Sequence, residues 1–267
     1  MAAALLVGGV VGAASLELSA GPAAGTELNG APATGPVSPR TIRVGLYNIH
    51  GAKGLDGRRD LGRIADLLEG LDFIGLNEVH QRWTTGNQAE ILGKTLGMQW
   101  LFTPTERCWS GEHFGSAILS RVPIDSWQRI PLASPRGDGY RNVVLVRIPH
   151  QHETLNVLVT HIDPRKDRES QLRAVLSLFL SLDEPAVLMG DLNTRADDPQ
   201  IVELLKFPGV TDCVSACGAP NPKNRIDWIF TRGLRCVQAG LKETIASDHP
   251  RIWAELELPA AATPGKE

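Results

Sequence analysis

The chain has 267 residues, of which 42% are hydrophobic and 21% charged, proportions typical of a folded globular protein and not of a disordered or collagen-like chain. A chain of this length can bury the core of one large domain without disulfide staples. Its formal net charge of -3 provides no general electrostatic attraction for polyanions, so nucleic acid is not the favoured substrate.

The first forty residues differ in composition from the rest of the chain. Residues 1–14 are a run of small and aliphatic residues, and residues 21–39 are rich in Gly, Pro, Ala and Thr. The apolar run is short for a bilayer span, and no Lys or Arg precedes it, as would be normal in a secretory signal. We expect residues 1–40 to be a signal or signal remnant followed by a flexible linker, which favours export to the periplasm or the outside over a cytoplasmic location. The alternative is a flexible tail.

From residue 41 onward, dense apolar runs typical of buried strands alternate with amphipathic stretches. The predicted strands cover residues 42–49, 73–79, 116–120, 142–148, 155–160, 186–189, 226–230 and 251–258. The predicted helices cover residues 60–71, 169–182 and 199–205. Because the second half lacks strict alternation of strand and helix, the pattern favours packed sheets flanked by helices over a TIM barrel or a Rossmann fold. We expect one domain over residues 41–259 and a disordered tail at 260–267.

The four cysteines lack the spacing of a structural zinc site. Cys213 and Cys217 could pair with each other or with Cys236 in an oxidising compartment. Equally, these thiols could be free and buried, as cysteines often are in α/β domains. The spacing of the cysteines, including Cys108, does not decide between these arrangements.

Polar residues recur where the predicted apolar strands end. They are Asn48, Glu78, His161, Asp191 with Asn193, Asp227, and the Asp248–His249 pair. A single acid at a strand end is usually a turn former or a helix cap, but this explanation weakens when the pattern repeats at six strand ends. Carboxylate and amide oxygens suit a hard cation such as Mg²⁺ or Mn²⁺, and histidines can stabilise the charge of a phosphate under attack by water. The set therefore predicts phosphoester hydrolysis.

Asp227 is the most informative of these residues, because it lies between Ile226 and Trp228 in an apolar strand. An unpaired acid in such a strand costs several kcal/mol on burial. Asp227 therefore needs a partner, and His249 is the candidate.

Six short segments resemble, in order, the motifs of the endonuclease/exonuclease/phosphatase family, which has a deoxyribonuclease-I-like fold. They lie at residues 47–51 (YNIHG), 77–79 (NEV), 160–163 (THID), 190–193 (GDLN), 225–227 (RID) and 247–249 (SDH). The first motif and the nearby LDGR also resemble a bacterial branch of metal-dependent hydrolases related to glycolipid-anchor remodelling proteins. The resemblance covers residues 41–258. It implies a four-layered α-β-β-α sandwich of two packed mixed sheets flanked by helices.

The resemblance also implies roles at the matching positions. Glu78 would bind the metal directly, while Asn48 and Asp248 would complete its shell or hold its waters. Asp191 would orient or deprotonate the attacking water, or act as a second metal ligand. Asn193 would bind the substrate phosphate or help to position the nucleophile.

The remaining implied roles concern the phosphate. His249, oriented by Asp227, would stabilise the pentacoordinate phosphorus, and His161 would contact a non-bridging oxygen from the other side. Either Arg141 or Arg136 would contact the phosphate, and Arg141 is favoured because it directly precedes a predicted strand.

The resemblance thus implies a metal-dependent phosphoesterase that acts on a phosphodiester or phosphomonoester, with a small or lipid-linked headgroup favoured. A DNA or RNA endonuclease is the alternative, although His50 stands where nuclease branches often carry an acid. A non-catalytic binding module on the same fold is a further alternative. We expect a monomer with no transmembrane span in its catalytic domain.

Overall fold

The structure, a computed structural model, describes residues 24–33, 35, 40–107, 112–134 and 140–258. Residues 1–23, the predicted tail at 260–267, Cys108 and Arg136 lie outside these ranges. No helix in the described ranges is long and apolar enough to cross a membrane.

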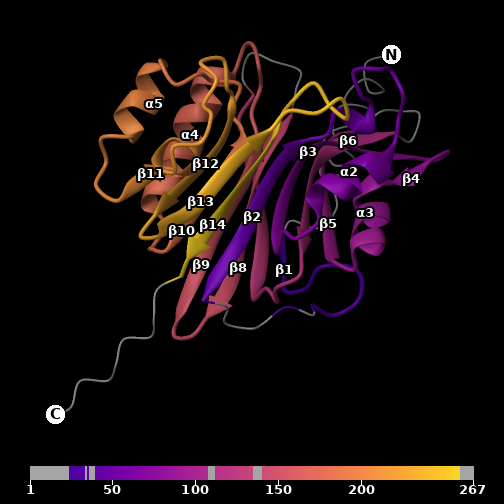
Figure 1. The fold of residues 1–267 in the computed structure, drawn as a ribbon, viewed down its shortest axis with the longest axis horizontal. Helices are drawn as coiled ribbons and strands as arrows, with labels where there is room; N and C mark the ends of the chain where they lie inside the picture. The colour runs from indigo at the N-terminus through magenta and orange to yellow at the C-terminus, as the bar shows by residue number, and fades with distance from the viewer. Residues whose placement is uncertain (1–23, 34, 36–39, 108–111, 135–139, 259–267) are drawn as a thin grey trace, which may run out of the picture.

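Two β-sheets pack face to face, and each has seven strands in the described part of the chain (Figure 1). The first sheet has the order β1 (Ala24–Gly25), β7 (Ser126–Leu132), β8 (Arg141–His150), β9 (Glu153–His161), β10 (Ala186–Asp191), β12 (Asp227–Arg232) and β11 (Val210–Asp212). The second has the order β13 (Arg235–Lys242), β14 (Arg251–Glu257), β2 (Thr41–Asn48), β3 (Phe73–Arg82), β6 (His113–Ser120) and β5 (Gln99–Arg107), with β4 (Gly86–Asn87) paired to β3.

Both sheets are mixed, and the parallel pair in each sheet determines where the polar strand ends lie. In the first sheet β9 and β10 are parallel, and in the second sheet β2 and β3 are parallel. The carboxyl ends of parallel neighbours lie at the same edge of a sheet. Each sheet therefore gathers two of the predicted functional strand ends at one edge.

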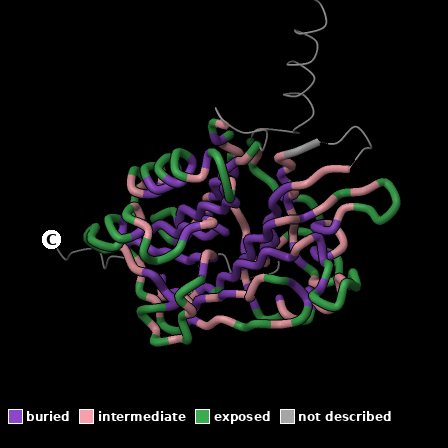
Figure 2. Tube along the Cα trace, turned by 90° about the horizontal axis from the view of Figure 1, so that it is seen from above, coloured by how far each residue is buried: buried purple, intermediate pink, exposed green. Residues whose placement is uncertain are grey.

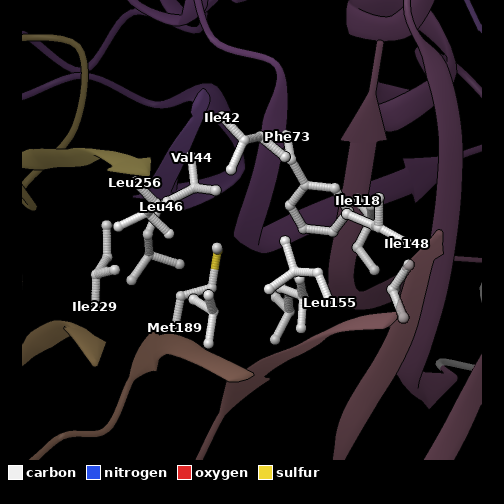
Figure 3. Close-up of a cluster of buried hydrophobic side chains, with 14 of the residues drawn as sticks. Ile42, Val44, Leu46, Phe73, Ile118, Ile148, Leu155, Met189, Ile229 and Leu256 are labelled. Carbon is white, nitrogen blue, oxygen red and sulfur yellow. The ribbon is translucent and has the colours of Figure 1, made fainter. Parts of the chain in front are cut away.

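The main core fills the space between the sheets. Figure 3 shows Val44, Phe73 and Ile118 of the second sheet facing Leu155 and Met189 of the first. These side chains are buried, as expected for inner faces packed about 10 Å apart. The two apolar faces therefore hold the sheets together.

Helices cover the outer faces of the sheets. On the second sheet lie α2 (Leu61–Leu68) and α3 (Gln88–Leu96), and on the first lie α4 (Arg168–Ser181) and α5 (Pro199–Leu204). A separate buried cluster joins each helix pair to its sheet. In Figure 2 the buried trace runs through the interior, and exposed helix and loop residues surround it. The predicted four-layered α-β-β-α sandwich is confirmed.

Part of the predicted linker packs against this domain. Ala24 and Gly25 pair with β7, Leu28 is buried in the core between the sheets, and the Trp127 ring nitrogen donates to the Glu27 carbonyl at 3.0 Å. Residues 24–33 therefore differ from the flexible linker expected there, because they supply a short edge strand and an apolar contact.

The cysteines adopt one of the arrangements that the sequence leaves open. A disulfide joins Cys213, in the short helix α6 (Cys213–Ala216), to Cys236 in β13, with a Cα–Cα distance of 5.7 Å. Cys217 is a half-buried free thiol. The disulfide ties α6 of one layer to an edge strand of the other sheet.

Candidate active site

The register of the strands places the predicted residues side by side. In the first sheet Asp191 is the register partner of His161 on β9 and of Asp227 on β12. In the second sheet Asn48 on β2 is the partner of Asn77 on β3. Neighbouring strands lie about 4.8 Å apart, so three reactive groups occupy adjacent positions at one edge of the first sheet.

Asp191 is the centre of the cluster. Its Oδ1 accepts a hydrogen bond from the backbone N–H of Asn193 at 2.9 Å, and its Oδ2 accepts from Asn48 Nδ2 at 3.1 Å. Oδ2 also lies 3.5 Å from His161 Nε2 and 3.8 Å from His249 Nε2. One buried carboxylate oxygen therefore faces an amide and two imidazoles.

The expected pairing of Asp227 with His249 is present. Asp227 Oδ2 lies 2.8 Å from His249 Nδ1, while the second carboxylate oxygen is buried and has no hydrogen-bond partner in the described structure. The backbone N–H of His249 donates to Ser247 Oγ at 3.3 Å, and that hydroxyl donates to the carbonyl of Asn48 at 2.7 Å. The imidazole is thus fixed through Nδ1, and Nε2 points toward Asp191.

Asn48 connects the two sheets at the site. Its Nδ2 donates to Glu78 Oε1 and to Asp191 Oδ2, each at 3.1 Å, and its Oδ1 accepts from the backbone N–H of His50 at 3.1 Å. All of its amide atoms therefore serve to position neighbours. The side chain holds a carboxylate from each sheet at one point.

Glu78 lies on a β-bulge. Between Leu76 and Val79 the register of β3 against β6 shifts by one residue, and Glu78 has a positive φ of 55°. Such a φ is uncommon for a residue with a side chain, and bulges redirect side chains at the ends of paired strands. The bulge turns the carboxylate toward Asn48 and the rest of the cluster.

Burial and neighbouring charges shift the pKa values of Asp191, His249 and His161. Burial, together with the charge of Asp227, raises the pKa of Asp191 to about 7. Burial of His249 opposes its charged form, but the hydrogen bond and charge of Asp227 and the charge of Asp191 outweigh it and raise its pKa to about 9. Burial, with the nearby charges of Arg141 and His249, holds the pKa of His161 well below its usual value. At neutral pH without metal, one imidazole is charged and the other neutral.

The family model that describes the Endonuclease/Exonuclease/phosphatase family matches residues 45–249. The chain belongs to this family. Its members hydrolyse phosphoester bonds. The matched segment includes every residue of the candidate site, from Asn48 to His249. No curated protein matched the sequence.

Solved structures of family members share the fold. An endonuclease/exonuclease/phosphatase from Beutenbergia cavernae is 25% identical, with a TM-score of 0.69 over 84% of this chain and 73% of that one. A mannosyl-6-phosphatase from Bacteroides thetaiotaomicron is 19% identical, with a TM-score of 0.64 over 80% of this chain and 99% of that one. D. rerio TDP2 in complex with a single-strand DNA product is also 19% identical, with a TM-score of 0.64 over 82% of this chain and all of that one.

Two of the expected phosphate contacts lie near the cluster but have other partners. Asn193 has a φ of 45°, and its Nδ2 donates to the carbonyl of Ile162 at 3.0 Å. The guanidinium carbon of Arg141 lies 5.6 Å from the ring centroid of Phe114, whose ring centroid is 6.4 Å from that of His161. Arg141 is therefore on the His161 side of the site, and its rival Arg136 is outside the described residues.

Asp248 lies at the open side of the cluster. Its side chain is half exposed, its Oδ1 is 3.5 Å from His50 Nδ1, and Ser247 Oγ lies 3.3 Å from the same oxygen. With Asp227 and His249 it lines a pocket of about 360 Å³. The pocket gives a ligand access to the partly exposed His249.

The residues present fit a hard divalent cation. Asp191, Asp227 and His249 place one ligand atom each within 4.8 Å of one another, and the Glu78 carboxylate reaches the same amide as Asp191. The unpartnered Asp227 oxygen adds an acceptor that lacks a proton donor. Oxygen-rich sets of this kind are the donors that Mg²⁺ and Mn²⁺ prefer.

Three groups that organise the site had no predicted role. Asn77 is buried and accepts from the Asp191 backbone N–H at 3.2 Å, while donating to Ser116 Oγ at 3.1 Å. Arg225 is buried 4.0 Å from the Trp228 ring centroid and binds both carboxylate oxygens of Asp212. Asn77 and Arg225 belong to segments that resemble family motifs, which was the available signal, whereas nothing near Asp212 indicated its role.

Proposed function

We propose that this protein is a divalent-metal-dependent phosphoesterase that hydrolyses a phosphodiester or phosphomonoester by in-line attack of water. The observation that carries the proposal is the meeting of Glu78, Asp191 and the Asp227–His249 pair around one point, with a pocket beside it. Separate surface acids acting as caps or turn formers would not be drawn together in this way.

The side chains divide the chemical work by position. Asp191 Oδ2 takes a proton from the attacking water, because it is the buried oxygen that faces the other groups. His249 Nε2 donates to an oxygen of the phosphorus centre, and Asp227 supports the positive imidazole through Nδ1. His161 contacts a second, non-bridging oxygen of the phosphate. Glu78, Asn48 and Asp248 would hold Mg²⁺ or Mn²⁺ beside the group formed by Asp191, Asp227 and His249, and the cation would supply positive charge to the phosphate.

The favoured substrate is a phosphoester on a small or lipid-linked headgroup. A phosphatase of a sugar phosphate among proteins with the same fold supports a small headgroup. The second candidate is a nucleic acid, supported by the structure of the TDP2 relative with a DNA product. The net charge of -3 favours the first.

We further propose that the protein is exported and acts as a monomer. The disulfide between Cys213 and Cys236 supports an oxidising compartment.

The test is hydrolysis of a substrate panel with Mg²⁺, Mn²⁺ or a chelator. The panel contains a phosphomonoester, a phosphodiester, a glycerophospholipid headgroup ester and a supercoiled plasmid. We expect turnover of at least one ester that the chelator abolishes, and that Glu78→Gln lowers by at least about 10²-fold. Glu153→Gln, an exposed glutamate at the opposite end of β9, is the matched control and should leave the rate unchanged. Equal turnover by Glu78→Gln would contradict the proposal, and plasmid nicking without ester turnover would favour the nuclease.

A further inference from the structure

The short turn η1 (His50–Ala52), which follows Asn48, has a strained backbone. His50, Gly51 and Ala52 have positive φ values of 48°, 57° and 60° in succession. This region is uncommon for residues with a side chain, so the conformation is costly at His50 and Ala52. Such strain persists only where surrounding contacts determine the backbone, and it is concentrated at functional sites.

Several contacts hold this turn in place. The carbonyl of Gly51 accepts from Arg59 Nη1 at 2.7 Å and from Gln88 Nε2 at 2.9 Å. A Cβ atom at Gly51 would lie 2.7 Å from Cδ2 of His80, so a side chain there would collide with this ring of β3. The turn is therefore anchored to its neighbours, and the position of His50 is determined with it.

The turn brings His50 into a closed set of contacts around Asn48. The backbone N–H of His50 donates to Asn48 Oδ1, and Asn48 Nδ2 donates to Glu78 Oε1, each at 3.1 Å. Ser247 Oγ donates to the Asn48 carbonyl at 2.7 Å and lies 3.3 Å from Asp248 Oδ1. His50 Nδ1 lies 3.5 Å from the same Asp248 oxygen. These contacts connect His50 to each of the three residues that we propose as the holders of the cation.

The imidazole of His50 is also accessible to a cation. Its side chain is 42% exposed and that of Asp248 is 49% exposed. Neighbouring ligand atoms of an octahedral ion lie about 3 Å apart, because each lies about 2.1 Å from the ion. The 3.5 Å between His50 Nδ1 and Asp248 Oδ1 is close to this separation. A small rotation of the two side chains would therefore bring both atoms onto one ion.

An exposed ion pair between His50 and Asp248 is the simpler explanation of their distance. Such a pair contributes little to stability, so it does not account for a turn that keeps three successive residues in the left-handed region. A ligand role accounts for both observations, because the turn places the imidazole beside the carboxylate.

A nitrogen donor changes the cation that a site prefers. Mg²⁺ favours oxygen ligands and loses its waters reluctantly, whereas transition-metal cations bind imidazole more readily. We propose that His50 ligates the bound cation and makes the site favour a transition-metal cation such as Mn²⁺ over Mg²⁺. The inference rests on the proposed function in placing the cation at Glu78, Asn48 and Asp248, and it deepens that function by choosing between the two cations.

The experiment measures binding of Mn²⁺ to the full chain by isothermal titration calorimetry without substrate, and binding of Mg²⁺ by its competition with Mn²⁺. His50→Asn replaces the imidazole by an amide and keeps a side chain that tolerates a positive φ. We expect the variant to bind Mn²⁺ at least about tenfold more weakly, while its affinity for Mg²⁺ changes by less than about threefold. His152→Asn, at an exposed histidine in the turn between β8 and β9, is the matched control and should leave both affinities unchanged.

A spectroscopic measurement separates ligation from a purely structural role of His50. Pulsed electron paramagnetic resonance of the bound Mn²⁺ should show coupling to an imidazole nitrogen, and His50→Asn should remove it while the circular dichroism spectrum stays the same. The proposal is overturned if the unaltered protein shows no such coupling, if the coupling survives in His50→Asn, or if that variant loses affinity for both cations equally. No hydrolysis is measured, so a protein that binds Mn²⁺ through His50 but cleaves no ester would contradict the proposed function alone.

Discussion

In the Asp227–His249 pair, a buried carboxylate positions a histidine, and the hydrogen bond between them offsets part of the free-energy cost of burial. Asp227 is almost fully buried on an apolar strand, and a single strong hydrogen bond at 2.8 Å to His249 Nδ1 offsets part of that cost. The same bond fixes the ring so that Nε2 faces Asp191 Oδ2 at 3.8 Å. The geometry therefore selects which nitrogen can meet a substrate.

This assignment predicts a large kinetic effect of His249. His249→Gln should lower kcat by about 10²–10³-fold, because the amide has no positive charge to place on the phosphorus oxygens. The measurement is steady-state kinetics on the best ester of the substrate panel, with circular dichroism to verify folding. His152→Gln, at an exposed histidine in the turn between β8 and β9, is the control and should be neutral. A loss of about tenfold or less for His249→Gln would exclude the proposed role.

The sequence indicated which residues would meet at the candidate site better than it indicated the contacts between them. Polar residues after apolar runs indicated Asn48, Asp191 and His161, since a strand end places a side chain at the edge of a sheet. The sequence could not reveal that the Asn48 amide contacts carboxylates of both sheets, because that contact depends on how the two sheets pack. Asn77 was missed as a positioning residue for the same reason.

At the level of secondary structure, burial decided what could be predicted. The strands β2, β9 and β10 are buried along most of their length, so their sequences are continuous apolar runs, and all three were predicted. The edge strand β13 is largely exposed and β7 buries few of its residues, so neither has such a run and both were missed. The helix α3 was also missed, because its buried face includes Gln88 and Gly93 and so lacks a continuous apolar stripe.

The disulfide is an element-scale feature with a measurable consequence. The Cys213–Cys236 bond closes a loop of 23 residues between α6 and β13, and the residue before Cys213 is Asp212, which binds Arg225. Closing a loop of this length lowers the entropy of the unfolded chain by an amount worth about 3 kcal/mol. The bond therefore stabilises the fold by constraining, in the unfolded chain, the segment that contains Asp227.

We predict that Cys213→Ala/Cys236→Ala lowers the free energy of unfolding by about 3 kcal/mol, measured by urea denaturation under oxidising conditions. Cys217→Ala serves as the control and should change it by less than about 1 kcal/mol, because this thiol is half buried and unbonded. Reductant should lower the stability of the unaltered protein toward that of the double variant. Identical denaturation curves for the unaltered and doubly substituted proteins would show that the bond does not form in solution.

At the scale of the whole molecule, the site lies where two sheets from different parts of the chain meet, and its charges are part of the folding equilibrium. The carboxylates of Glu78, Asp191 and Asp227 lie close to the imidazoles of His161 and His249, at the edge of the apolar core. Without a cation, Asp191 and His249 hold protons in the folded state more tightly than in the unfolded chain. The stability of the metal-free protein is therefore linked to pH.

Folding raises the pKa of both Asp191 and His249. A pKa that is raised on folding contributes stability that is complete below the unfolded pKa and is lost as the pH rises through the folded value. For Asp191 the loss runs from its usual pKa of 3.8 to about 7, and for His249 from the usual pKa of 6.5 to about 9. The metal-free protein should therefore lose stability steadily between mildly acidic and alkaline pH.

We predict that the thermal unfolding midpoint, measured in chelator by differential scanning calorimetry, falls as the pH rises from 6.5 to about 9, the window of His249. Asp227→Asn removes the hydrogen bond and charge that raise the His249 pKa, and it also lowers the pKa of Asp191, whose shift is partly due to Asp227. The slope in this window should therefore flatten in that variant. Excess Mg²⁺ should also flatten it in the unaltered protein, because the positive charge of a bound cation lowers the pKa of the neighbouring His249. A slope that Asp227→Asn leaves unchanged would mean that the Asp227–His249 pair does not control the linkage.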